Sequence, residues 1–328
     1  MDISVVVISY NSEQFLEENI NSLIHQSVPF KEIVVVDNHS SDESLKIIES
    51  FEKDCPTIRK LAPDYNTGYA KGANMGIRNT HSHLVLAANA DIILDVDFNA
   101  AVIKKFEGDP GLSLLSPLIM RFDNRTVDSA GQTYSKALHP REIGFNRPLS
   151  RVDVNEKPMF SVCGAATVFR RSALEILKLG DDYYDEDFFI FWEDFDIGWR
   201  AQLLGMKVLF FPGARVCHFR GATLEKSFWS RFSRFSLALA RPAFIKYHLV
   251  KNRYLTLIKN FRFKRFYWAI PFIIVKDIAW VGLLTIFSPK IIISLVKSRK
   301  LFKIALAKRK MLKDKEQEIR NKEQQPDG

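Results

Sequence analysis

Two almost unbroken runs of β-branched residues near the start of the chain restrict its fold most strongly. Residues 3–10 read Ile-Ser-Val-Val-Val-Ile-Ser-Tyr, and residues 33–36 read Ile-Val-Val-Val. Such runs are typical of strands buried on both faces of a parallel sheet. Each run is followed by apolar residues at helical spacing, over 15–24 and 45–48. This alternation predicts an α/β domain with a doubly wound, mostly parallel, Rossmann-like sheet.

Charge is divided unevenly along the 328 residues. Residues 1–224 carry 23 Lys and Arg against 31 Asp and Glu, whereas residues 225–328 carry 24 against 7. The basic part is also rich in Phe, Trp, Ile and Leu, which favours an anionic membrane surface over nucleic acid as its partner. We therefore predict an α/β domain over residues 1–224, an α-helical, basic, amphipathic region over residues 225–310 and a charged tail over residues 311–328.

The apolar part of the basic region is interrupted by charges. Within residues 266–296, Lys276-Asp277 and Pro289-Lys290 break the pattern, and the longest uncharged stretch runs only from Ile278 to Pro289. A bilayer span needs roughly 20 apolar residues. The pattern favours amphipathic helices lying in the membrane interface over a distorted single span. Burial of this segment against the rest of the protein stays open.

The cysteines and the N-terminus indicate the compartment. Cys55, Cys163 and Cys217 are odd in number and show no CxxC spacing, which argues against a disulfide framework or a zinc site. The chain begins directly with a strand-like run, without a basic segment or cleavage site of a secretory signal. We expect a cytoplasmic protein, peripheral on the inner face of the cell membrane.

Polar residues follow the second β-branched run directly. Asp37 and Asn38 are therefore expected at the carboxyl edge of the sheet, where α/β folds bind ligands. Neither GxGxxG nor GxxxxGK[ST] occurs in the chain, so the usual dinucleotide and P-loop interpretations lack support. Asp37 can accept hydrogen bonds from a ribose or a base edge. The same Asp-Asn pair can also simply form a turn.

Two further segments carry groups suited to a nucleotide. Residues 66–76 are rich in Gly and Asn, which let the backbone approach a ligand and supply amide groups, although a tight helix entry has the same composition. Asn89-Ala90-Asp91 ends another strand-like run. Oxygen ligands on alternate residues face one side of an extended chain, where they can hold a divalent cation against a diphosphate.

The stretch from Phe188 to Arg200 places five bulky apolar residues directly before the carboxylates of Glu193, Asp194 and Asp196. The spacing predicts a helix that begins at these acids. Acids there either stabilise the helix start or perform proton chemistry. The apolar wall would raise the pKa of such a base and the helix N-terminus would lower it, and the sequence leaves the balance open.

Two other parts of the chain bear on the same edge. Residues 121–160 are polar, contain three prolines and show little periodicity, which predicts a long irregular excursion that shapes a substrate pocket. His218 follows the last predicted strand and is expected on the same face as Asp91.

These motifs occur in one order along the chain: residues 5–11, residues 34–38, residues 66–70 with Asn74, residues 89–91, residues 193–196 with Arg200, and His218. In this order they resemble family 2 inverting glycosyltransferases with the GT-A fold, most closely the rhamnosyltransferase-like branch of polysaccharide assembly. The resemblance covers residues 3–260.

The resemblance implies a role for each matching residue. Asp194 would be the general base, and Asp91 and His218 would hold Mg²⁺ or Mn²⁺. Because Asn89 replaces the first acid of the DxD-type motif, metal dependence stays open. Glu193, Asp196, Arg200 and Gly164 would contact the acceptor or support the base, with ion pairing of Arg200 to Glu193 or Asp196 as an alternative. The donor would be bound by Tyr10, Asn11, Asp37, Asn38, Asn66, Gly68, Asn74, Asn89 and Asp91.

The implied reaction moves a sugar, rhamnose or another, from a dTDP-, UDP- or GDP-sugar to a saccharide or lipid-linked saccharide during cell-surface polysaccharide synthesis. Sugar hydroxyls are poor nucleophiles at neutral pH, so one positioned carboxylate must take the proton, and a single displacement inverts the anomeric centre. A sugar nucleotidyltransferase would need a glycine-rich basic loop after the first strand, and Ser9-Tyr10-Asn11-Ser12 is not one. A non-catalytic membrane-bound scaffold would not need Asp91, Asp194 and His218 together.

Overall fold

The computed structural model describes residues 1–220 and 241–324. They form two compact units, which we describe separately. The first contains Met1–Thr133, Glu142–Phe189 and the described residues from Glu193 to Arg220; the second contains Tyr134–Arg141, Ile190–Trp192 and the described residues from Arg241 onward. The expected domain boundary after residue 224 lies outside the described residues and stays a prediction.

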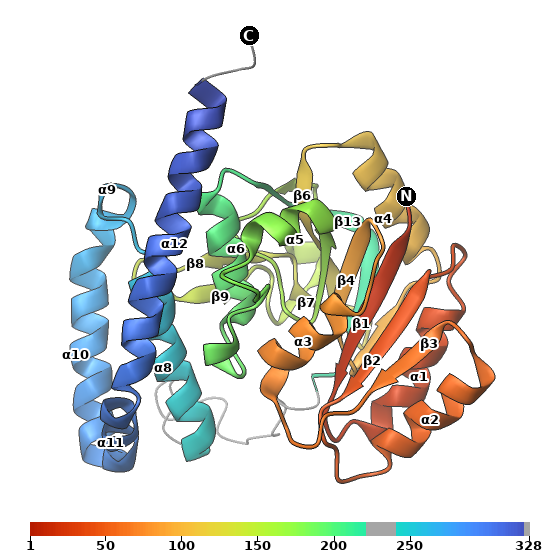
Figure 1. The fold of residues 1–328 in the computed structure, drawn as a ribbon, viewed down its shortest axis with the longest axis horizontal. Helices are drawn as coiled ribbons and strands as arrows, with labels where there is room; N and C mark the ends of the chain where they lie inside the picture. The colour runs from red at the N-terminus through yellow and green to blue at the C-terminus, as the bar shows by residue number, and fades with distance from the viewer. Residues whose placement is uncertain (221–240, 325–328) are drawn as a thin grey trace. The chain divides into compact units, whose positions relative to one another are not determined.

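A mixed, mostly parallel sheet forms the centre of the first unit (Figure 1). Strands β4 (Leu84–Asn89), β1 (Ile3–Ser9), β2 (Glu32–Asp37) and β3 (Ile58–Leu61) lie side by side and run parallel. Beyond β4, strand β12 (Ala166–Arg170) runs antiparallel to β4 and to β6 (Leu112–Arg121). The expected α/β class with a mostly parallel sheet is confirmed.

Helices cover both faces of β1, which explains its unbroken apolar sequence. Val5 and Val7 face a core that includes Leu16 of α1 (Glu13–Ile24) and residues of α2 (Ser44–Asp54) and α4 (Phe98–Gly108). On the other face lies α3 (Gly68–Arg78), so close that a Cβ on Gly76 would lie 2.1 Å from Val6 Cγ1. Successive strand residues thus serve opposite layers. Helices α5 (Arg171–Leu177) and α6 (Glu193–Leu203) follow later in the chain.

Residues 121–160 are not the irregular excursion expected from their composition. They contain several short elements: β7 (Thr126–Ser129), β8 (Gln132–Tyr134), β9 (Pro140–Glu142), β10 (Arg147–Pro148), η1 (Leu149–Arg151) and β11 (Lys157–Pro158). Strands this short carry too few residues to show an alternating pattern. Strands β8 and β9 form a separate two-stranded sheet, and the turn that joins them falls in the second unit.

Strand β13 (Lys207–His218) runs parallel to β6 and antiparallel to β5 (Ile92–Leu94). The strand passes through Pro212-Gly213 without ending. Its register against β6 shifts between Phe211 and Arg215, because a proline has no N–H to donate to the ladder. The shift lets the strand continue to His218.

The described part of the second unit is mostly helical. Its core includes Val250, Leu284 and Ile291. The charged tail expected from residue 311 begins inside a continuous helix, where Leu312 is buried and Glu316 pairs with Arg262. The helices are α8 (Ala243–Asn260), α9 (Phe263–Phe266), η4 (Tyr267–Ala269), α10 (Ile270–Phe287), α11 (Pro289–Lys297) and α12 (Arg299–Gln324).

The segment Phe263–Phe287 is, by length and composition alone, apolar enough to cross a membrane, and 6% of its most apolar window is buried. Its exposed apolar side chains include Phe272, Val275 and Ile278. By length and composition, this segment therefore meets the condition for the single span, the alternative that the sequence favoured less than interfacial helices.

Candidate active site

The carboxyl ends of the parallel strands bring the expected nucleotide-binding residues to one edge. In the sheet register, Ser9 of β1 lies beside Asp37 of β2, and Ile8 lies beside Asn89 of β4. Tyr10 is exposed just beyond β1. The side chain of Asn11 accepts a hydrogen bond from the Ser41 backbone N–H at 2.8 Å and so ties the β1 end to the loop after β2.

Asp37 carries a carboxylate oxygen that is buried at this edge. Its Oδ2 atom accepts a hydrogen bond from the Ser40 backbone N–H at 3.1 Å. Its Oδ1 atom has no hydrogen-bond partner among the described residues. A buried acceptor without a partner is uncommon because desolvating it costs free energy. This atom is therefore a suitable acceptor for a hydroxyl or N–H group of a nucleotide.

Three asparagines expected to contact the donor instead form hydrogen bonds within the protein, mostly to backbone groups. Asn38 accepts hydrogen bonds from the N–H and hydroxyl of Thr67, both at 2.8 Å, and donates to the Gly68 carbonyl at 3.0 Å. Asn66 accepts from the Gly68 N–H at 2.9 Å. Asn74, fully buried, exchanges hydrogen bonds of 2.8 Å with the Tyr184 backbone. Buried backbone groups need such partners, so direct donor contact by Asn38 and Asn74 is corrected to a structural role.

Gly68 also has a structural reason for its identity. Its φ angle is +77°, and a Cβ there would lie 2.6 Å from the Phe189 carbonyl oxygen. The glycine therefore lets the start of α3 pack against Phe189, whose carbonyl accepts a hydrogen bond from the Ala70 N–H at 3.2 Å. Close approach of a ligand is not needed to explain it.

Gly68→Ala should lower the free energy of unfolding by about 1–3 kcal/mol, because the new methyl group meets backbone and the φ angle disfavours alanine. Gly72→Ala is the matched control in the same helix, since its Cβ would meet the nearest atom at an ordinary 3.5 Å. Urea denaturation measures both. Equal stability of the two variants would contradict the packing role given to Gly68.

Asp91 and His218 lie together, as the sequence predicted. His218 ends β13 opposite Ile92 of β5, and its Nε2 atom lies 3.2 Å from Asp91 Oδ1. Its Nδ1 atom lies 2.8 Å from Oδ2 of the fully buried Asp128. Burial alone would lower the pKa of His218, but hydrogen bonds to Asp128 and Asp91 and their charges raise it to about 9. Asp128 was missed because it lies in the segment without periodicity.

The donor set around Asp91 fits a divalent cation that a diphosphate also binds. The described residues contain no group of three His, Cys, Asp or Glu side chains placed to hold a metal. Mg²⁺, however, is usually bound through one or two carboxylates together with substrate phosphates and water. Histidines that bind a metal through one ring nitrogen usually form a hydrogen bond from the other ring nitrogen to a carboxylate. Asp128 is such a partner for Nδ1 of His218.

Asp194 lies in the first turn of α6, as predicted. Its Oδ2 atom accepts hydrogen bonds from the Gly164 backbone N–H at 2.9 Å and from Gln132 Nε2 at 2.7 Å. A Cβ on Gly164 would lie 3.2 Å from this carboxylate, so a larger residue would crowd it. Desolvation raises the pKa of Asp194 above its usual value, against the opposing hydrogen bonds from Gly164 and Phe195. The sequence left open whether burial or the helix N-terminus dominates the pKa of this acid, and in the structure the effect of burial is larger.

The other acids of α6 have different surroundings. Glu193 is buried, its Oε2 atom has no partner among the described residues, and desolvation and the charge of Asp194 raise its pKa well above the usual value. Asp196 and Arg200 are both fully buried and form an ion pair of 3.0 Å. Arg200 also donates to the carbonyls of Leu177 and Tyr183. The pairing of Arg200 with one of these acids is therefore confirmed, whereas the alternative, acceptor contact by Asp196 and Arg200, is corrected.

Gln132 and Glu142 are functional candidates that the sequence did not reveal. Gln132 Nε2 donates to Asp194 Oδ2 and to Glu142 Oε1, both at 2.7 Å, so one amide group bridges two carboxyl groups. Desolvation and the charge of Asp194 raise the pKa of Glu142 to about 7, against hydrogen bonds from Ser129 and Gln132. Strands β8 and β9 are too short to give a sequence signal for this pairing.

The backbone just before α6 adopts an unusual conformation. The φ angles of Phe189, Phe191 and Trp192 are +66°, +70° and +75°. Bulky residues rarely adopt this region, and such strain is concentrated at functional sites. Within the second unit, Asn252 of α8 donates to the carbonyls of Ile190 and Phe191, both at 2.7 Å, and so holds the strained turn.

Comparison with known proteins identifies related chains. The model of the family described as Glycosyl transferase family 2 matches residues 4–177. A poly-beta-1,6-N-acetyl-D-glucosamine synthase of Staphylococcus epidermidis is 23% identical over 212 residues, which are 65% of this chain and 48% of that protein. The chain thus spans about half the length of the curated relatives it matches.

Solved structures share the fold. A crystal structure of GalNAc-T7 with UDP, GalNAc and Mn²⁺ superposes with a TM-score of 0.59 at 17% identity, covering 79% of this chain and 48% of that one. A crystal structure of S. aureus TarS 1–349 in complex with UDP-GlcNAc gives 0.53 at 18% identity, covering 79% and 67%. At these identities the likeness shows a GT-A-like fold: a mostly parallel sheet with flanking helices.

Proposed function

The chain belongs to glycosyl transferase family 2, and on that premise we propose that it transfers a sugar from a nucleotide-diphosphate donor to a hydroxyl group of a saccharide acceptor. The observation that carries the proposal is the carboxylate of Asp194, partly accessible and fixed by Gly164 and Gln132. A fixed carboxylate with a raised pKa is suited to accept the proton of an attacking hydroxyl.

In the proposed mechanism, Asp194 Oδ2 or Oδ1 takes the acceptor proton as the acceptor oxygen attacks the anomeric carbon. The donor's bond to its diphosphate breaks in the same displacement, so the anomeric centre inverts. The two hydrogen bonds to Oδ2 limit rotation of the carboxylate and hold it in one orientation. Desolvation and the charge of Asp194 raise the pKa of Glu193 well above its usual value, which disfavours a second negative charge beside the base.

The donor site in this proposal is the edge formed by Tyr10, Asn11, Asp37, Asn89 and Asp91. Asp37 Oδ1 would accept a hydrogen bond from the nucleoside. Asp91 would hold Mg²⁺ or Mn²⁺ together with His218, which must release its Nε2 proton to bind the metal. The metal when bound neutralises charge on the diphosphate leaving group. The solved GalNAc-T7 complex contains Mn²⁺ and UDP, which supports a metal-assisted site of this kind.

We propose two candidate donor sugars, in order of preference. UDP-N-acetylglucosamine comes first, because TarS was crystallised with UDP-GlcNAc and the curated relatives are poly-N-acetylglucosamine synthases. dTDP-rhamnose comes second and rests on the motif order in the sequence alone. The acceptor would be a growing saccharide, free or linked to a lipid, at the inner face of the cell membrane. The apolar segment Phe263–Phe287 supports membrane association.

A donor panel tests the proposal. The full-length protein is incubated with UDP-GlcNAc, GDP-mannose or dTDP-rhamnose, with and without saccharide acceptors, and release of nucleoside diphosphate is measured. Acceptor-stimulated release from one donor is the expected result. A nucleotidyltransferase would instead form pyrophosphate from a nucleoside triphosphate and a sugar phosphate, and a scaffold would release neither product.

Glu142→Gln should remove an ionisation near pH 7 from the pH profile of kcat/KM and leave the acid limb in place. The charge of Asp194 is one cause of the rise of the Glu142 pKa to about 7, so Asp194 loses its proton first, while Glu142 is still neutral. Glutamine keeps that neutral state at every pH, so no second negative charge develops beside the base. Glu107→Gln, at an exposed site, is the control and should leave the profile unchanged. An inflection near pH 7 that persisted in Glu142→Gln would contradict the coupling.

A further inference from the structure

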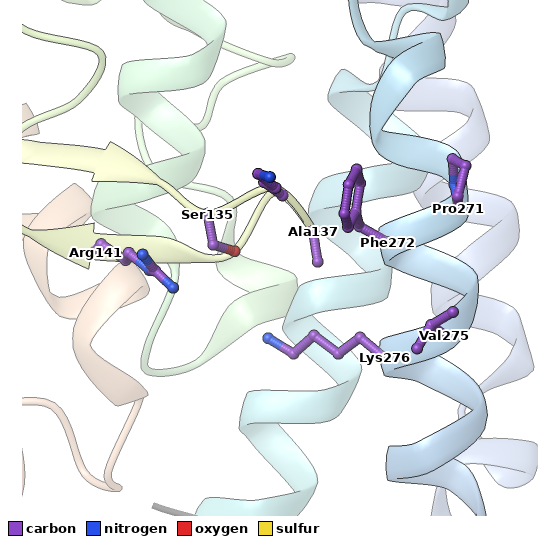
Figure 2. Close-up of a pocket in the computed structure, with 8 residues that line it drawn as sticks. Ser135, Ala137, Arg141, Pro271, Phe272, Val275 and Lys276 are labelled. Atoms are coloured by element: carbon purple, nitrogen blue, oxygen red, sulfur yellow. The ribbon is translucent and has the colours of Figure 1, made fainter.

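A cavity of about 720 Å³ lies within the second unit, between α10 and the turn that joins β8 to β9 (Figure 2). Lys136 and Arg141 line it from the turn, and Phe272, Val275 and Lys276 line it from α10. The figure shows Lys276 extending from the helix toward the turn. One wall is therefore cationic and the other largely apolar.

The cavity has a surplus of positive charge. Its lining contains three cations and no Asp or Glu. Within residues 1–220 and 241–324, no ion pair joins Lys136, Arg141 or Lys276 to a carboxylate. The nearby Asp277 is paired with Arg253 at 2.9 Å, which also donates to the Ala137 carbonyl at 3.0 Å.

A histidine in the same turn reports this positive field. The pKa of His139 falls to about 3, first because of burial and then because of the charges of Lys276, Arg253 and Arg141. The imidazole therefore stays neutral and adds no further charge. An anion entering the cavity would lower the repulsion among these cations.

The apolar wall continues onto the surface of α10. Phe272 is 43% exposed and Val275 is 70% exposed. The Lys136 ammonium group lies 5.2 Å from the centre of the Phe272 ring, so charge and apolar surface meet at one point. Phe272 and Val275 belong to the segment Phe263–Phe287, the described segment that is apolar enough to cross a membrane.

From this juxtaposition we propose that the cavity binds the phosphate group of an anionic lipid, with the phosphate at Lys136, Arg141 and Lys276 and the lipid chain along Phe272 and Val275. A free phosphate would leave the apolar wall exposed to water. A neutral lipid would leave the three cations without a counter-charge. A phosphate carried by a lipid supplies a counter-charge to the three cations, and the lipid chain covers the apolar side chains of α10.

Three soluble probes separate the contribution of the phosphate charge to binding from that of the acyl chains. Dihexanoyl phosphatidic acid, kept below its micelle concentration, carries both phosphate and chains; dihexanoylglycerol carries only the chains; inorganic phosphate carries only the charge. Titration calorimetry with the full-length protein should show the tightest binding for the phosphatidic acid. Flotation with phosphatidylcholine vesicles, with and without phosphatidic acid, then tests the same preference in a bilayer.

Lys276→Gln and Arg141→Gln should each weaken binding of the short-chain phosphatidic acid about tenfold, because each removes one charge-assisted contact. Lys290→Gln makes the same charge change at an exposed site at the start of α11 and should leave the affinity unchanged. Circular dichroism checks that each variant is folded, and Arg141 is exposed, so its replacement should not disturb packing.

Several results would overturn the proposal. Equal weakening by Lys290→Gln would show unspecific attraction to a basic surface. Inorganic phosphate binding as tightly as the lipid would indicate a free-phosphate site, and displacement by polyglutamate with no lipid binding would indicate a protein partner. Because these assays measure binding without turnover, their failure would leave the proposed sugar transfer untouched.

Discussion

Asp194→Asn should lower kcat about 10²- to 10⁴-fold, the usual contribution of a positioned general base. The amide has the shape of the carboxylate, and its oxygen can still accept the hydrogen bond from the Gly164 N–H. It cannot take a proton from an acceptor hydroxyl at neutral pH. The fold and the donor site at Asp37 and Asp91 should therefore be retained while the displacement step is lost.

Three measurements define this result: acceptor-stimulated release of nucleoside diphosphate, nucleoside diphosphate binding by calorimetry, and thermal unfolding. Asp181→Asn, an exposed acid in the loop before α6, makes the same charge change and should leave kcat unchanged. Turnover near the wild-type rate in Asp194→Asn would remove this residue as the base. Loss of donor binding together with turnover would instead indicate a structural role.

Asp91→Asn should lower kcat/KM about 10²- to 10³-fold, because the cation can supply several kcal/mol of charge stabilisation to the leaving group. The variant removes the carboxylate that lies 3.2 Å from His218 Nε2. Binding of nucleoside diphosphate should also lose most of its enhancement by Mn²⁺. This second readout does not depend on turnover.

Titration of Mn²⁺ into the protein with and without nucleoside diphosphate measures the effect. Asp97→Asn, six residues further along and exposed, is the matched control and should bind the metal as the wild type does. If Asp91→Asn kept the same metal-stimulated turnover and the same metal-dependent binding, the metal role of this residue would be excluded. His218→Gln is expected to weaken metal binding in the same assay.

Part of the site could be predicted because strand ends are marked in the sequence. Asp37 and Asn89 follow buried apolar runs, and parallel strands bring their carboxyl ends to one edge. The start of α6 at Glu193 was predicted from the apolar spacing that follows it. His218 was placed near Asp91 from chain order alone, and the structure brings the two together.

Other parts could not be predicted because they depend on partners far along the chain. Gln132 meets Asp194 across 62 residues, and Asp128 meets His218 across 90. The amides of Asn38 and Asn74 were expected to contact a ligand. A side-chain amide can equally form hydrogen bonds with backbone groups, and in the folded protein both asparagines accept hydrogen bonds from buried backbone N–H groups. The left-handed turn at Phe191 and Trp192 also has no local signal, since aromatic residues disfavour it.

The sequence by itself determined the α/β class, the edge at which polar residues gather and the basic, apolar character of the C-terminal region. These depend on periodicity, strand ends and composition, which are local properties of the chain. Only the tertiary structure decided that β12 runs antiparallel within the sheet, which carboxyl groups share Gln132, and that Asp196 is buried with Arg200. Long-range packing fixes the burial that raises the pKa values of Glu142, Glu193 and Asp194. The folded protein therefore supplies the physical surroundings that distinguish the candidate base Asp194 from its neighbours.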